Sequence, residues 1–267
     1  MPETKVKTED GAELAVFTDG DGPDLLLVSG LAGTAAYWDP IVPELARSFR
    51  VIRLDQRGTG RSTRGSGDAT TITGLAEDCF EVLDAVDSKR ALLVGHSTGG
   101  VILQSMALMH EASIAGLVLS GTWAKPNKYM TELFRSRAEM LKAVPKEYAA
   151  MVAFLGSPAD WLNTHWPAYQ SMLDAAPVSI AQQEVLAERI AAIVDFDRSG
   201  EIGAIKVPIL VQGAEDDLIV PAFLQRELHA LLPKAELAML ASGGHFFPTT
   251  RPSAFIDSIK SFARQVG

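Results

Sequence analysis

The sequence predicts an α/β fold with a doubly wound, mostly parallel sheet and an inserted helical cap. Short apolar runs alternate with helical patterns in the first part of the chain and again near its end, which is typical of a parallel sheet with helices on both faces. From about residue 123 to 205 the strand pattern disappears and helical patterns dominate. We therefore expect a core of residues 1–122 and 206–267 and a cap of residues 123–205. Open α/β folds bind ligands at the carboxyl ends of their strands, where we expect the cap to lie.

The individual elements follow from the local patterns. Runs rich in Leu, Ile and Val suit strands that are buried on both faces. They predict strands at 25–28, 51–54, 91–94, 116–119, 207–213 and 237–240. Helical periodicity predicts helices at 71–87 and 98–110 in the core and at 128–143, 145–155 and 178–195 in the cap.

A serine stands at the apex of a predicted strand-turn-helix, in the sequence Gly95-His96-Ser97-Thr98-Gly99. Such a turn needs glycine two residues on either side of the serine, because the strand and helix backbones approach too closely for side chains there. The turn exposes the hydroxyl beside a helix N-terminus, which stabilises negative charge. Ser97 is therefore the candidate nucleophile.

A serine hydroxyl needs a base and an orienting acid to act as a nucleophile at neutral pH. His245 lies in a Gly-rich loop after the predicted strand 237–240, and no other histidine is placed in this way. Two carboxylates, Asp216 and Asp217, follow an upstream predicted strand. The residues thus predict a Ser-His-Asp triad in which either aspartate is a candidate acid.

A second small-residue loop, Ser29-Gly30-Leu31, follows the first predicted core strand. Such a loop can bring a backbone amide close to the nucleophile. We expect the backbone N–H groups of Leu31 and Thr98 to form an oxyanion hole.

With these motifs in order, the chain resembles the α/β-hydrolase superfamily over nearly its whole length. It looks most like the 3-oxoadipate enol-lactonases and the aminoacrylate or carbamate hydrolases of pyrimidine utilisation. The resemblance to the second group rests on residues 29–31, on Asp-Gln-Arg-Gly-Thr-Gly at 55–60 and on Pro-Ala-Asp-Trp at 158–161. The chain order Ser, Asp, His is that of the superfamily. Because these motifs occur together, an ordinary turn serine and a loop histidine without chemistry are disfavoured.

The resemblance also bears on individual residues. In the families resembled, the catalytic aspartate lies four residues before a proline, so Pro221 selects Asp217, with Asp216 as the alternative. The commoner family pattern has His-Gly where this chain has Ser29-Gly30, which removes a side chain that usually braces the oxyanion loop.

The function expected is cofactor-independent hydrolysis of a small carboxylic ester or lactone. Cleavage of a small amide or carbamate is the alternative that the pyrimidine-pathway resemblance suggests. Haloperoxidase or perhydrolase activity is a third alternative. A non-catalytic ligand-binding protein on the same fold is the fourth, since a fold does not fix a function.

The cap is rich in aromatic residues, and we assign Trp123, Trp161 and Trp166 to substrate binding. Further apolar residues of the predicted cap are Tyr129, Met130, Phe134, Met140, Tyr148, Met151, Phe154, Tyr169 and Met172. The alternative interpretation is that these side chains only pack the cap helices onto the core. Eight Lys and Arg stand against ten Asp and Glu in the cap, so we expect a compact, neutral or weakly charged acyl group.

The composition of the chain limits the classes of partner that it is expected to bind. The net charge of −9, without a basic run, disfavours nucleic acid and anionic membranes. No apolar stretch approaches the length that spans a bilayer, the N-terminal residues are too polar for a signal peptide, and one cysteine excludes an intramolecular disulfide. We expect a cytoplasmic protein with a small-molecule substrate. No metal or dinucleotide motif is recognisable, so no metal or cofactor is expected, and the oligomeric state stays open.

Overall fold

The backbone forms an eight-stranded sheet with strand order β1-β2-β4-β3-β5-β6-β7-β8. The computed structural model describes residues 3–66 and 70–266. The strands β3 to β8 run parallel, whereas β1 and β2 at one edge are antiparallel to their neighbours. The strand bounds are β1 Glu3–Lys7, β2 Glu13–Asp19, β3 Asp24–Val28, β4 Arg50–Leu54, β5 Ala91–His96, β6 Ile114–Ser120, β7 Ile209–Ala214 and β8 Glu236–Leu240.

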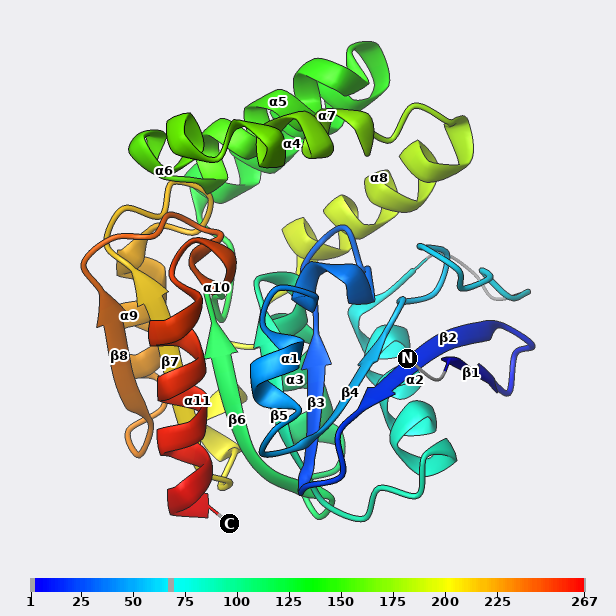
Figure 1. Cartoon of the computed structure of the whole chain (residues 1–267), viewed down its shortest axis with the longest axis vertical. Helices are drawn as coiled ribbons and strands as arrows, with labels where there is room; N and C mark the ends of the chain where they lie inside the picture. Colours follow the sequence, from blue (N-terminus) through cyan, green and yellow to red (C-terminus); the bar gives the residue numbers. More distant parts are fainter. Residues whose placement is uncertain (1–2, 67–69, 267) are drawn as a thin grey trace.

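Helices cover both faces of the sheet (Figure 1). One face carries α1 (Val42–Leu45) and α11 (Pro252–Val266), and the other carries α2 (Ile72–Ala85), α3 (Thr98–Met109) and α9 (Ala222–Ala230). The short helices α10 (Phe247–Thr250), η1 (Ala35–Trp38) and η2 (Ile202–Ala204) lie in connections.

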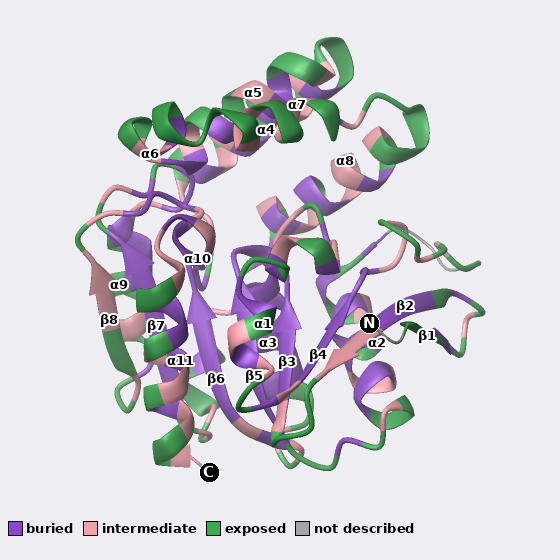
Figure 2. Cartoon of the chain, viewed as in Figure 1, coloured by how far each residue is buried: buried purple, intermediate pink, exposed green. Residues whose placement is uncertain are grey.

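Each face of the sheet has its own apolar core, because successive strand residues point to opposite faces. In β3, Leu26 and Val28 pack into the cluster that contains α2 and α3. Leu25 and Leu27 pack with α1 and α11 instead. All four side chains are fully buried, as the uninterrupted apolar run predicts. The sheet is purple throughout its centre in Figure 2, which colours buried residues in this way.

The segment between β6 and β7 contains helices and no strand. We call helices α4–α8 of this segment the cap. The bounds are α4 Lys128–Ala143, α5 Pro145–Gly156, α6 Ala159–Thr164, α7 Trp166–Asp174 and α8 Ile180–Asp195. Figure 1 shows these helices beyond the carboxyl ends of the parallel strands. Side chains start the longest two: Asn127 accepts a hydrogen bond from the Met130 amide, and Ser179 and Gln182 form a capping box.

The expected fold class is confirmed, and the expected strands and helices coincide with observed elements to within a few residues at each end. The elements that the local patterns did not predict include β1, β2, α6 and α7. The first two form an antiparallel edge whose residues alternate in burial only weakly. The last two are short, and a short helix carries too few turns for a clear period.

No helix in the described ranges is both long and apolar enough to cross a membrane. Within the same ranges, no group of three or more His, Cys, Asp or Glu side chains is arranged to hold a metal ion.

Candidate active site

Ser97 stands at the tight turn between β5 and α3. Its backbone has φ 56° and ψ −121°, and residues other than glycine rarely adopt a positive φ. Conformations of this kind persist where the surrounding structure enforces them, and they gather at functional sites. The sequence prediction of a strand-turn-helix with serine at the apex matches this geometry.

The two glycines around Ser97 are required by close backbone contacts. A Cβ at Gly99 would collide with the carbonyl oxygen of Val28 on the neighbouring strand, and one at Gly95 would collide with the carbonyl group of Gly99. Helix α3 therefore begins against the end of the sheet, with Ser97 lifted above it.

His245 and Asp217 meet although they lie in separate loops after β8 and β7. The His245 Nδ1 group donates a hydrogen bond to Asp217 Oδ2 at 2.8 Å. The other carboxylate oxygen, Oδ1, accepts hydrogen bonds from the amides of Ile219 and Val220 at 2.9 Å and 2.8 Å. Both side chains are buried. The carboxylate is thus held on both oxygens, which orients the imidazole and selects the tautomer with Nε2 as proton acceptor.

Asp216, the alternative acid, makes different contacts. Its two carboxylate oxygens accept hydrogen bonds from the amides of Gly243 and Gly244, at 3.1 Å and 2.8 Å. These glycines immediately precede His245, so Asp216 holds the loop whereas Asp217 holds the ring.

The Leu31 loop lies beside Ser97, as expected for an oxyanion loop. Leu31 and Ser97 line the same cavity, and the amides of Leu31 and Thr98 have no hydrogen-bond acceptor among the described residues. The loop is braced without the histidine of the commoner pattern. Gln56 Nε2 donates to the Ser29 carbonyl at 2.8 Å, and Arg189 Nη1 donates to the Leu31 carbonyl at 3.3 Å.

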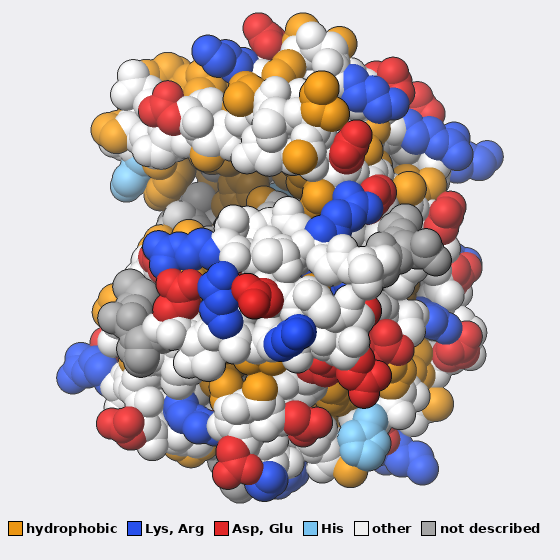
Figure 3. Space-filling model, turned by 90° about the vertical axis from the view of Figure 1, so that its right-hand side faces the viewer, with side chains coloured by type: hydrophobic (Ala, Val, Ile, Leu, Met, Phe, Trp, Pro, Cys, Tyr) orange, Lys and Arg blue, Asp and Glu red, His pale blue; other side chains and the backbone are white. Residues whose placement is uncertain are grey.

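A cavity of about 460 Å³ lies between the cap and the core, and Ser97 and His245 are in its wall. Figure 3 shows the hollow between the helical layer and the body of the molecule, with hydrophobic side chains inside it. Its wall is largely apolar and comes from both parts of the chain. Core residues in the wall include Gly30, Leu31, Tyr37, Ile219 and Phe246, and cap residues include Phe134, Arg137, Tyr148, Val152, Met172, Val185 and Leu186.

The three tryptophans assigned to substrate binding are not among the described residues that line this cavity. Trp123 is fully buried in the core. Trp161 stacks on His165 with 4.3 Å between ring centroids, and Trp166 is 46% exposed and stacks on Tyr169. The periodic pattern identified aromatic helices, but it did not say which face of each helix turns toward the cavity.

Two buried rings near His245, those of His96 and Tyr37, are uncharged. His96 lies with its ring centroid 4.8 Å from that of His245, and burial lowers the pKa of His96 well below 6.5, with the nearby His245 as a second cause. Tyr37 stacks on His96, and burial raises the Tyr37 pKa well above 10.0. Both rings are neutral near pH 7, so the charge in the cavity comes from other side chains.

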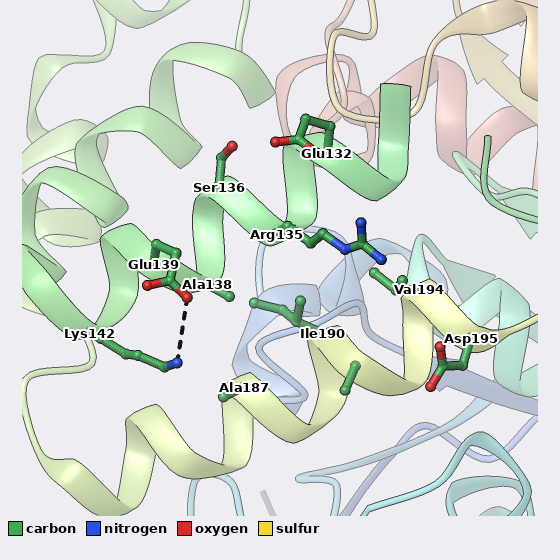
Figure 4. A pocket seen from close by; sticks show the side chains of 11 residues that line it. Glu132, Arg135, Ser136, Ala138, Glu139, Lys142, Ala187, Ile190, Val194 and Asp195 are labelled. Carbon is green, nitrogen blue, oxygen red and sulfur yellow. Dashed lines mark ion pairs between the residues drawn. The ribbon is translucent and has the colours of Figure 1, made fainter. Parts of the chain in front are cut away.

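A second hollow lies between α4 and α8 and has a different character (Figure 4). Its wall combines charged side chains with small apolar ones, and Lys142 forms a 3.6 Å ion pair with Glu139 there. The residues drawn include none of the candidate catalytic groups. We therefore regard the Ser97 cavity as the candidate active site.

These features define a class of protein. Residues 23–252 match the family model of the alpha/beta hydrolase fold, and the chain belongs to that family. The resemblance found in its motifs is confirmed.

Individual relatives are more specific. The chain is 36% identical over 253 residues to a protein of Variovorax paradoxus (strain S110) that bears the name carbamate hydrolase RutD, covering 94% of this chain and 95% of that protein. It is 35% identical over 254 residues to the protein of the same name from Agrobacterium fabrum, covering 92% and 94%.

Two solved structures share the fold over nearly the whole chain. A hydrolase from Pseudomonas aeruginosa PA01 superposes with a TM-score of 0.88 at 29% identity, covering 98% of each chain. The enol-lactonase from Burkholderia xenovorans LB400 superposes with a TM-score of 0.87 at 27% identity, covering 98% of this chain and 100% of that one.

Proposed function

We propose that this protein is a serine hydrolase that cleaves a small carboxylic ester or lactone through an acyl-enzyme. Ser97 Oγ attacks the carbonyl carbon while His245 accepts its proton, and Asp217 stabilises the imidazolium that forms. The amides of Leu31 and Thr98 donate hydrogen bonds to the oxyanion. His245 passes the proton to the leaving oxygen and then activates the water molecule that hydrolyses the acyl-enzyme.

One observation carries this proposal. The buried Asp217 carboxylate accepts the Nδ1 proton of His245 at 2.8 Å, which leaves Nε2 as the ring's proton acceptor in the cavity that Ser97 also lines. A serine hydroxyl, an oriented histidine and free backbone amides in one cavity are the groups that acyl transfer uses. The similarity to an enol-lactonase supports an ester or lactone as the substrate.

Cleavage of a small carbamate is the second candidate, and the names of the RutD relatives favour it. The same groups would act, but His245 would have to protonate a leaving nitrogen, which is a poorer leaving group than oxygen. A substrate panel separates the two: ethyl esters and γ-lactones on one side, a primary amide and an alkyl carbamate on the other.

Covalent labelling tests the mechanism itself. We expect a fluorophosphonate to modify wild-type protein at Ser97 and to leave Ser97→Ala unlabelled. Turnover of the best substrate should fall about a thousandfold or more in that variant, with the fold intact. Ser136→Ala, which removes an exposed serine from the cap, is the matched control and should behave as wild type. Full turnover by Ser97→Ala would refute the covalent mechanism, and a non-catalytic binding protein would show neither labelling nor turnover.

A further inference from the structure

Arg137 is the one lysine or arginine among the described residues that line the Ser97 cavity. It projects from α4, and no Asp or Glu side chain belongs to the described residues that form this wall. His96, which also lines the cavity, is neutral because burial lowers its pKa. The cavity wall therefore carries positive charge at Arg137, although the cap as a whole has slightly more acidic than basic residues.

The Arg137 guanidinium is buried but poorly satisfied. Only 6% of the residue is exposed. The group lies over the rings of Phe134 and Tyr148, with its central carbon 4.9 Å and 5.4 Å from their centroids. Its Nη2 donates to the Tyr148 hydroxyl oxygen at 3.2 Å, and its Nε is buried without any acceptor among the described residues.

The other buried arginines in the described part of the chain have oxygen partners. Arg53 forms ion pairs with Asp19 and Asp39, and Arg189 donates to three oxygen atoms. In the described part of the chain, no carboxylate forms an ion pair with Arg137. A buried cation without an anion is costly, and such sites are normally completed by a counter-charge. The aromatic contacts supply only part of this stabilisation.

We propose that Arg137 and Tyr148 form a carboxylate subsite, so that the substrate carries a carboxylate group in addition to the bond that is cleaved. A guanidinium edge matches a carboxylate in a planar, two-point arrangement. The Tyr148 hydroxyl accepts from Arg137 and has its own proton available to donate to the same anion. This inference rests on the proposed function, and it narrows the substrate to a short ester or lactone that carries a free carboxylate.

A carboxylate fits this subsite better than a phosphate. The wall offers one guanidinium and one phenol in otherwise apolar surroundings, whereas a phosphate dianion needs more donors to replace its water shell. The cavity volume of about 460 Å³ suits a compact molecule.

Matched substrate pairs test the subsite. The monoethyl esters of succinic, glutaric and adipic acid are each compared with ethyl butyrate, pentanoate and hexanoate, which replace the distal carboxylate with a methyl group. Wild-type protein should prefer the carboxylate member of at least one pair by about tenfold or more in kcat/KM. Arg137→Met should lower that ratio about 10- to 100-fold, the effect of losing charge-assisted hydrogen bonds. Arg137→Lys should recover part of the ratio, and Tyr148→Phe should lower it several-fold.

Arg135→Met is the matched control, because Arg135 is an exposed arginine on the same helix and lies in the wall of the second hollow, between α4 and α8 (Figure 4). It removes the same charge from α4 and should leave the ratio at the wild-type value. Absence of a wild-type preference would overturn the proposal. So would an equal loss on both members of a pair in a folded Arg137→Met, since a purely structural role predicts that result. If Arg137→Met does not fold, the ratios of Arg137→Lys and Tyr148→Phe decide in the same way.

A binding measurement separates this inference from the proposed function. Calorimetric titration of wild-type protein and Arg137→Met with hexanoate and with inorganic phosphate requires no turnover. Hexanoate binding that weakens about tenfold or more in Arg137→Met supports the subsite even if no ester is hydrolysed. Hexanoate binding that is unchanged in the variant, or weaker in wild type than phosphate binding, overturns it even if Ser97 proves to be the nucleophile.

Discussion

Arg189 in the cap donates through Nη1 to Gln56 Oε1 in the core at 2.7 Å. Gln56 in turn donates to the Ser29 carbonyl, and Arg189 also reaches the Leu31 carbonyl. Burial lowers the pKa of Arg189 to about 10, so the guanidinium stays charged at neutral pH. Helix α8 is thereby connected directly to the loop that would carry one oxyanion donor.

This connection predicts that Arg189 positions the Leu31 amide. We expect Arg189→Met to lower kcat on a neutral ester about tenfold or more, with a smaller change in KM. Loss of a whole oxyanion donor costs about 100- to 1000-fold, and a displaced donor should cost less. Steady-state kinetics and thermal unfolding should be measured together, with Arg135→Met as the control. A folded Arg189→Met with wild-type kcat would show that the loop keeps its position without this contact.

The two neighbouring aspartates should differ sharply on substitution. Asp217→Asn should lower kcat by about a thousandfold or more, because the amide no longer orients and stabilises the imidazolium of His245. Asp216→Asn should have a mild effect on kcat, because its remaining oxygen can still accept one loop amide. Single-turnover rates with an activated ester provide the measurement. A larger loss in Asp216→Asn than in Asp217→Asn would reassign the acid.

Acyl-chain preference should respond to the residues of the cavity wall. Leu186→Ala enlarges the cavity and should shift the hexanoate-to-acetate ratio of kcat/KM toward the longer chain by about tenfold or less. Trp161→Ala serves as the comparison, since Trp161 stacks on His165 outside this wall and should leave the ratio unchanged. The opposite pattern would mean that substrate reaches Ser97 along a different surface.

His96 should make the fold sensitive to mild acid. The pKa of His96 is lowered in the folded state, so below about pH 6.5 the unfolded chain binds a proton that folded His96 does not. Stability from the neutral ring is therefore complete above that pH and is lost as the pH falls. From pH 7.5 to 5.5, wild type should lose about 1.4 kcal/mol of unfolding free energy relative to His96→Asn. Urea unfolding at both pH values measures this, and parallel losses would contradict the assignment.

Local patterns were sufficient for the sheet and for the nucleophile turn. The apolar run of β5 and the glycines around Ser97 describe one short stretch of chain, and its geometry follows from steric limits on that stretch. His245 and the aspartate pair could also be found, because each lies in a loop directly after a predicted strand. Arg137 and Arg189 were missed, yet each occupies a position on the buried stripe of its helix. A basic residue on an apolar stripe is the signal that could have identified them.

The sequence by itself determined the fold class, the turn at Ser97 and the small set of groups able to act with it. Backbone sterics and hydrophobic periodicity operate over a few residues and therefore can be read along the chain. The resemblance had selected Asp217, and the tertiary structure shows that this aspartate meets His245. Only the tertiary structure decided which cap side chains face the cavity and where charge lies in its wall. These features depend on how helices distant in sequence rotate and pack against the sheet. Composition does not distinguish one arginine from another, whereas the tertiary structure places Arg137 in the cavity wall.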